Sequence, residues 1–177
     1  MTHFEKKLSG ETVLNGIIIN VEHDKVLLEN GQEAMREVVR HRGAVAILAV
    51  EDGEILLVRQ FRYPLNAELL EIPAGKLEAG EEPLPAAFRE LKEETGGICG
   101  EMIPLGSYYG SPGICDEKIW LYFARITGRG ETHPDEDEFL TLEKYTPAQL
   151  DELIARGEVQ DGKTLSALVL ARSRGLL

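Results

Sequence analysis

The chain has 177 residues, 43% of them hydrophobic, so it can bury one sizeable core. Its 31 acidic and 19 basic residues give a formal net charge of −12, which argues against nucleic acid as a partner because binding a phosphate backbone requires a basic face. No run of eighteen apolar residues occurs and the first residues lack the apolar stretch of a signal peptide, so we expect no membrane partner and a cytoplasmic location.

The N-terminal part of the chain predicts a small antiparallel sheet. Apolar, β-branched stretches at 16–22 and 25–28 are separated by a short polar step, and an Asn-Gly turn signal precedes a third strand at 33–39. We treat residues 1–43 as an N-terminal β-sheet appendage and residues 44–177 as the main domain.

Two long apolar strands are predicted at the centre of the main domain. Residues 44–50 (AVAILAV) and 55–60 (ILLVRQ) flank an Asp-Gly pair that is typical of a hairpin turn, and their apolar runs indicate strands covered on both faces. Residues 68–72 supply a further short strand, which leads into Pro-Ala-Gly at 73–75.

The segment 75–97 reads GKLEAGEEPLPAAFRELKEETGG and contains a short helix signal. We expect a helix of roughly ten to twelve residues that begins within 83–85 and ends at the Gly-Gly pair. Leu84, Phe88 and Leu91 point to one side of this helix, and we expect that side to be buried.

Another arc of the same helix carries Glu90, Glu93 and Glu94, spaced three and four residues apart. Like charges this close repel and raise carboxylate pKa values, so they require either a solvated surface or a bound cation. A water-facing helix of Glu and Lys is the plain alternative, and Lys92 fits it. Oxygen ligands without nearby His or Cys favour Mg²⁺ or Mn²⁺ over zinc.

The rest of the chain predicts three strands followed by two helices. Because strands predominate early and helices late without strict alternation, the domain is expected to be a layered α/β fold with a mixed sheet. The strands are expected near 102–109, 118–126 and 139–145, and the helices at 147–156 and 163–174.

The glycine, carboxylate and arginine spacing of the helix segment resembles the signature box of the Nudix hydrolases. The matching positions are Gly75, Glu81, Arg89, Glu90, Leu91, Glu93, Glu94 and Gly96. One departure is Gly97, where the family usually has an apolar residue, which here follows as Ile98. The resemblance implies an α/β/α sandwich over about residues 44–174.

Residues 71–76 (EIPAGK) resemble the lead-in to the box in bacterial ADP-ribose pyrophosphatases. That resemblance implies Mg²⁺, with Mn²⁺ as an alternative, held by the Ala74 carbonyl, Glu90, Glu94 and Glu138. It also implies a catalytic base in the acidic loop at 133–138 (HPDEDE), at Glu136, with Asp135 and Asp137 as alternatives. Glu93 would support the metal site and Arg89 would orient the glutamates.

Fifteen residues separate Gly96 from Pro112, and a proline at about this distance marks the ADP-ribose group of the family. By the same resemblance, Glu117 would contact a ribose. Ser-Pro-Gly is equally typical of an ordinary turn. Arg59 and Arg62 are expected to bind the substrate phosphates, and Arg36 is expected either at the substrate or across a dimer interface.

The resemblance implies hydrolysis of ADP-ribose to AMP and ribose 5-phosphate. Other nucleoside diphosphate sugars, such as GDP-mannose, are the alternative substrates, and a noncatalytic nucleotide-sensing module is the alternative class. In such relatives the N-terminal sheet helps to form a domain-swapped homodimer, whereas an intramolecular cap is the simpler alternative.

Overall fold

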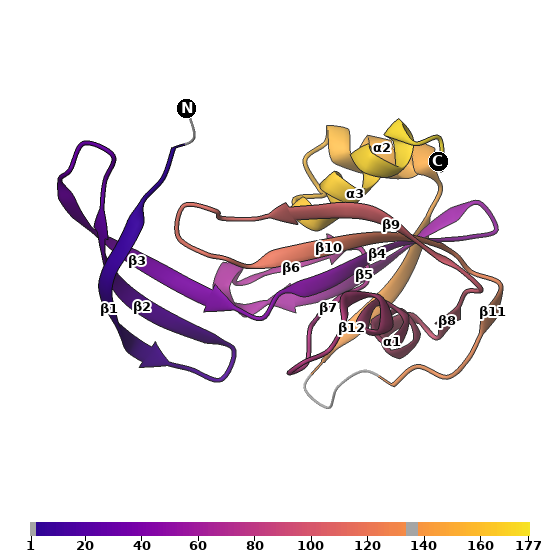
Figure 1. The fold of residues 1–177 in the computed structure, drawn as a ribbon. Helices are drawn as coiled ribbons and strands as arrows, with labels where there is room; N and C mark the ends of the chain where they lie inside the picture. Colours follow the sequence, from indigo (N-terminus) through magenta and orange to yellow (C-terminus); the bar gives the residue numbers. More distant parts are fainter. Residues whose placement is uncertain (1–2, 134–137) are drawn as a thin grey trace. The chain divides into compact units, whose positions relative to one another are not determined.

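The computed structural model describes residues 3–133 and 138–177, and the chain divides into two compact units (Figure 1). The first unit comprises residues 1–43 and 109–118. The second comprises residues 44–108 and 119–177. No helix in the described part of the chain is long and apolar enough to cross a membrane.

The first unit contains a three-stranded antiparallel sheet in the order β1-β2-β3. Its strands are β1 (Lys6–Asn15), β2 (Ile19–Leu27) and β3 (Glu33–His41). The small antiparallel sheet is confirmed, but the predicted strand boundaries were wrong. The prediction did not include β1, and it divided β2 into two strands at His23 and Asp24.

The two errors have different physical causes. Every residue of β1 is exposed, so this strand carries no alternation of buried and exposed residues that could reveal it. In β2 the polar step lies inside the strand, because Asp24 is buried and paired with cationic side chains. Segment 109–118 belongs to the same unit and is joined to β3 by a parallel bridge between Val39 and Cys115.

The second unit is built on a seven-stranded mixed sheet in the order β12-β5-β4-β10-β9, with β6 paired to β5 and β7 paired to β4. Strand β4 runs parallel to β10, whereas its pairs with β5 and β7 are antiparallel. The strands are β4 (Ala44–Glu51), β5 (Glu54–Arg62), β6 (Ala67–Glu71), β7 (Ala74–Lys76), β9 (Met102–Tyr109), β10 (Lys118–Arg125) and β12 (Leu140–Tyr145).

Helices cover both faces of this sheet (Figure 1). They are α1 (Pro83–Thr95), α2 (Pro147–Ala155) and α3 (Gly162–Ser173). Alternate residues of β4 enter different cores: Leu48 packs in the cluster that contains Leu150 and Leu168, while Ile47 packs in the cluster that contains Leu91. The expected α/β/α sandwich and the expected burial of β4 on two faces are confirmed.

Turns and caps explain several element ends. Asp52 and Gly53 both have positive φ angles, 52° and 85°, as the predicted β4–β5 hairpin requires. Helix α1 ends at Gly96, which has a left-handed φ of 67° and donates its N–H to the Lys92 carbonyl at 2.8 Å. A short helix at Tyr63–Leu65 and the two-stranded pair β8 (Gly97–Ile98) and β11 (Gly128–Arg129) were not expected, because such short pieces carry too few residues to show a pattern.

The face of α1 that packs on the sheet differs from the expected one. Leu91 is buried as predicted, but Leu84 and Phe88 are exposed. The buried face consists of Ala86, Ala87, Glu90, Leu91, Glu94 and Thr95. Two small alanines let the helix approach the sheet closely, and two carboxylates enter the interior with them.

Candidate active site

Two box carboxylates lie buried where α1 meets β7. Glu90 is 8% exposed and Glu94 is 3% exposed. The backbone N–H of Ala74 donates to Glu94 Oε2 at 2.9 Å. A Cβ atom on Gly75 would lie 2.0 Å from the Glu90 carboxylate, so any other residue at the first position of the box would force that carboxylate to move.

The two buried carboxyl groups resist ionisation. Burial raises the pKa of Glu94 to about 8, against an ordinary value of 4.5, and the charges of Glu90 and Glu138 add to this effect. Burial also raises the pKa of Glu90 to about 7, although the neighbouring Arg89 opposes that shift. The expected direction is therefore confirmed, but loss of hydration is the larger cause and like-charge repulsion the smaller.

Arg89 connects the box loop to the helix. Its Nε and Nη2 donate to the two oxygens of Glu81 at 2.9 and 2.8 Å. Its Nη1 donates to Glu90 at 2.7 Å and to Glu93 at 2.9 Å. Glu81 also accepts the backbone N–H of Glu78 at 2.9 Å. The structure thus brings Arg89 into contact with the glutamates that it was expected to orient.

The carboxylate oxygens of Glu90 and Glu94 are ligands of the kind that a hard divalent cation binds. Among the described residues, Glu94 has one hydrogen-bond donor, Ala74, and no cationic partner within 4.0 Å, so a buried anion there requires an added positive charge. Within residues 3–133 and 138–177, however, no three His, Cys, Asp or Glu side chains lie close enough together to hold a metal ion. The assignments of Glu138 and of the Ala74 carbonyl as ligands stay predictions.

The acidic loop is described only at its flanks. On one side, the N–H of His133 donates to the carbonyl of Glu93 at 2.9 Å, and the N–H of Gly130 donates to the carbonyl of Gly96 at 2.7 Å. On the other side, the charge of Glu138 acts on both buried carboxyl groups. The predicted base, Glu136, and the alternatives 135 and 137 lie outside the described residues.

A second buried ionic group joins β5, β6 and the start of α3. Glu71 is 1% exposed and accepts Arg62 Nε and Nη2 at 2.6 and 2.7 Å. It also accepts Lys163 Nζ at 2.6 Å, and Lys163 in turn donates to Asp161 at 2.8 Å. Burial alone would raise the pKa of Glu71, yet Arg62 and Lys163 together lower it below 4.5.

Neither Asp161 nor Lys163 was singled out in the sequence analysis. Asp161 caps α3 by accepting the backbone N–H of Thr164 at 2.9 Å. An Asp just before a helix is a known start signal, so the cap was detectable from the sequence. That Lys163 reaches Glu71 was not detectable, because the two residues come from distant parts of the chain and meet only in the fold.

Each arginine predicted to bind substrate already has a carboxylate partner. Arg59 donates to Glu143 at 2.6 and 3.2 Å, and Arg36 donates to Glu5 at 2.9 and 2.6 Å. A guanidinium has five N–H groups, so such two-bond pairing leaves donors for a phosphate. Arg59 and Arg62 belong to the second unit, whereas Arg36, Pro112 and Glu117 belong to the first.

Known proteins are similar to this chain over most of its length. The sequence model described as the NUDIX domain matches residues 39–168. A "Methanol dehydrogenase activator" of Bacillus methanolicus is 42% identical over 167 residues, which are 93% of this chain and 90% of the relative. The ADP-ribose pyrophosphatase of Bacillus subtilis is 41% identical with the same coverage.

Two further matches extend the comparison. The ADP-ribose pyrophosphatase of Mycobacterium tuberculosis is 36% identical over 172 residues, which are 94% of this chain and 83% of that protein. The crystal structure of an ADP compounds hydrolase matches with a TM-score of 0.85 at 25% identity, covering 97% of this chain and 95% of the other.

Proposed function

The chain belongs to the Nudix hydrolase family, and on that basis we propose that it splits ADP-ribose and water into AMP and ribose 5-phosphate. The observation that carries the proposal is the buried carboxylate pair, Glu90 and Glu94, held against Ala74 and Gly75 by the spacing of the box. Relatives named for ADP-ribose, 41% and 36% identical, support this substrate over others.

A divalent cation supplies the charge that this chemistry needs. A diphosphate repels an incoming hydroxide, and a bound cation neutralises its oxygens and acidifies water. We propose Mg²⁺, with Mn²⁺ as an alternative, and the carbonyl of Ala74 with Glu90, Glu94 and Glu138 as the residues that would hold it. The two buried carboxyl groups must lose their protons before they can bind it.

In the proposed reaction a water oxygen attacks one phosphorus atom, and the bond from that phosphorus to the bridging oxygen breaks. The water proton passes to a carboxylate, for which we propose Glu136. Arg89 keeps the carboxylate of Glu90 in place through its 2.7 Å hydrogen bond and, through Glu93, supports the same side of the helix. Arg59 and Arg62 would bind phosphate oxygens through their remaining N–H groups.

We further propose that residues 1–43 form a dimerisation element attached to a hydrolase domain, residues 44–177. All ten residues of β1 are exposed, and apolar side chains at Leu8, Val13 and Leu14 are among them. A three-stranded sheet with so much exposed apolar surface gains stability from a second copy. Sedimentation of the purified protein tests the dimer, and cell fractionation tests the expected cytoplasmic location.

The substrate is tested by incubating the purified protein with ADP-ribose, GDP-mannose and other sugar nucleotides, with Mg²⁺ or with EDTA, and measuring AMP or GMP release. The proposal expects AMP and ribose 5-phosphate in equal amounts from ADP-ribose, and no release in EDTA. Faster release of GMP from GDP-mannose than of AMP from ADP-ribose would make GDP-mannose the assigned substrate. Undiminished release in EDTA would show that the reaction does not need the cation.

A second candidate function rests on the Bacillus methanolicus relative, which is as similar as the pyrophosphatases but is named as an activator of methanol dehydrogenase. The chain would then act on a dehydrogenase as partner. Adding the protein to a methanol dehydrogenase and measuring its rate tests this candidate. A Glu94→Gln variant separates the two functions, because activation that survives this change does not depend on the buried carboxylate.

A further inference from the structure

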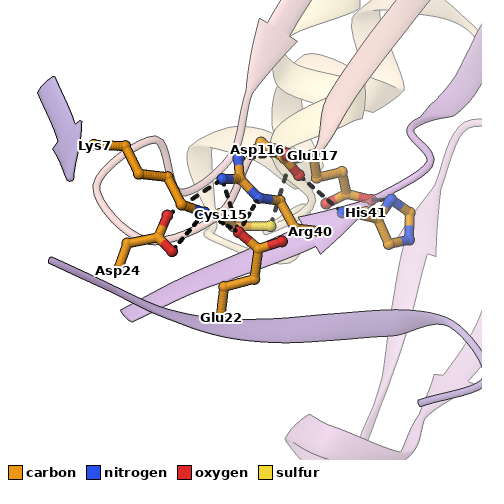
Figure 2. Close-up of polar contacts among 8 residues, drawn as sticks. All are labelled: Lys7, Glu22, Asp24, Arg40, His41, Cys115, Asp116 and Glu117. Atoms are coloured by element: carbon orange, nitrogen blue, oxygen red, sulfur yellow. Dashed lines mark hydrogen bonds and ion pairs between the residues drawn. The ribbon is translucent and has the colours of Figure 1, made fainter. Parts of the chain in front are cut away.

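Arg40, near the end of β3, links β2 to segment 109–118 within the first unit (Figure 2). Its Nε and Nη2 both donate to Glu22 Oε2 at 3.1 Å, and Nη2 lies 3.6 Å from Asp24 Oδ2. Its Nη1 points the other way and donates to Asp116 Oδ2 at 3.2 Å. One guanidinium therefore holds carboxylates from two distant parts of the chain.

Segment 109–118 is attached to β3 by backbone as well. The N–H of Val39 donates to the Ile114 carbonyl at 2.7 Å, and the N–H of Asp116 donates to the Val39 carbonyl at 3.1 Å. Asp116 uses its second oxygen, Oδ1, to accept the N–H of His41 at 2.8 Å. The Asp116 side chain thus joins both the backbone of β3 and Arg40.

The charges around Arg40 make it difficult to replace. Asp24 is 4% exposed, and Lys7 Nζ lies 2.6 Å from its Oδ1. On the facing strand β1, a Cβ at Gly10 would lie 2.0 Å from the same oxygen, so that strand has a glycine where Asp24 enters. Glu22, Asp24 and Asp116 are three carboxylates served by two cations, Lys7 and Arg40.

The segment held in this way carries two of the residues that were expected to contact the substrate, Pro112 and Glu117. Pro112 lies in a turn in which the N–H of Cys115 donates to the Ser111 carbonyl at 2.9 Å. Glu117 directly follows Asp116, and its Oε1 lies 3.4 Å from Nδ1 of His41 (Figure 2). A shift of the segment along β3 would move both residues together.

We propose that Arg40 and Asp116 are positioning residues whose ion pair fixes the register of segment 111–117 on β3, and so sets the affinity for the nucleoside diphosphate sugar without taking part in bond breaking. The inference rests on the proposed function and on the expectation from the sequence that Glu117 contacts a substrate ribose. It assigns the pair to substrate binding because none of the contacts that the pair makes with described residues reaches the box carboxylates of α1.

The test compares Asp116→Asn with a matched control. Asparagine keeps an oxygen for the N–H of His41 but removes the charge that faces Arg40. The control is Asp151→Asn, which removes the partner of Arg172 from another aspartate–arginine pair of similar exposure, 51% for Asp151 and 41% for Asp116. Both variants are measured for amide hydrogen exchange and for steady-state kinetics with ADP-ribose.

We expect Asp116→Asn to speed exchange in peptides covering 109–118 and to raise KM by roughly three- to tenfold with kcat unchanged, because the pair affects binding alone. Asp151→Asn should change neither. In a double-mutant cycle, Arg40→Gln combined with Asp116→Asn should raise KM by less than the product of the two single effects. Unchanged amide hydrogen exchange outside the first unit would show that the variants are folded.

Several results would overturn the inference. Unchanged exchange in 109–118 would mean that the pair does not hold the segment, and faster exchange with unchanged KM would mean that its role is structural only. A fall in kcat at constant KM would also reject it. If the wild type hydrolysed no sugar nucleotide, the proposed function and the claim on affinity would both fail, while the exchange data would still decide whether Arg40 and Asp116 hold the segment.

Discussion

Replacing Glu94 with glutamine should stabilise the metal-free protein while removing its activity. The carboxyl group is 3% exposed, and burial raises its pKa from 4.5 to about 8. Glutamine keeps the volume and an oxygen that can accept the N–H of Ala74, but it carries no charge at any pH. The variant therefore removes the penalty of a buried anion together with a ligand charge.

The magnitude follows from the pKa shift. A group with a raised folded pKa favours folding when protonated, so its contribution is intact below pH 4.5 and is lost as the pH rises to about 8. Each pKa unit corresponds to about 1.36 kcal/mol. Relative to the protonated group, Glu94 therefore lowers the free energy of unfolding by about 2 kcal/mol at pH 6 and by at most about 5 kcal/mol at pH 9. For a protein of this size, 1 kcal/mol shifts Tm by about 2–4 °C.

The assay is thermal unfolding in EDTA at pH 6 and pH 9. Glu94→Gln should melt about 4–8 °C above the wild type at pH 6 and up to about 10–20 °C above it at pH 9. The control is Glu152→Gln, an exposed glutamate on α2, which should melt like the wild type at both pH values. Saturating Mg²⁺ should raise the wild-type Tm and leave that of Glu94→Gln nearly unchanged.

A wild type and a Glu94→Gln variant with the same Tm at pH 9 in EDTA would refute the reasoning, since the ionised carboxylate would then not be destabilising. A gain of equal size at pH 6 and pH 9 would refute it as well, because the effect must grow as the group ionises. Turnover of ADP-ribose by Glu94→Gln at the wild-type rate would show that the carboxylate is not needed for the reaction.

Three further predictions concern the same unit. Gly75→Ala should reduce kcat/KM at least roughly tenfold in the panel assay, because its Cβ would lie 2.0 Å from the Glu90 carboxylate and displace it; wild-type activity would mean that this carboxylate tolerates movement. Lys163→Met leaves buried Glu71 paired with Arg62 alone and should lower the free energy of unfolding, measured in urea, by about 1.5–3 kcal/mol, whereas a loss below about 1 kcal/mol would show that water replaces the lysine. The calorimetric affinity for Mg²⁺ should fall steadily from pH 9 to pH 6, because protons compete for two carboxyl groups with pKa values of about 7 and 8; a flat profile would exclude them as ligands.

Much of the fold was predictable because its signals are local. The apolar runs of β4 and β5, the Asp-Gly turn between them and the glycine after α1 each depend on a few neighbouring residues. Strand β1 was not predictable, because a strand with every side chain exposed shows no hydrophobic period. The exposure of Leu84 and Phe88 was missed because the buried face of α1 is formed by alanines and glutamates.

The residue spacing alone identified the box, its family and the carboxylates of α1, because those features are encoded within one short segment. Only the tertiary structure showed that Glu90 and Glu94 are buried, since burial depends on β7 lying against the helix. The pairing of Lys163 with Glu71 and of Arg40 with Asp116 likewise required the fold, because their partners are separated by 92 and 76 residues in the chain. Local chemistry can be read along a sequence, whereas loss of hydration and long-range ion pairs exist only once distant segments have packed together.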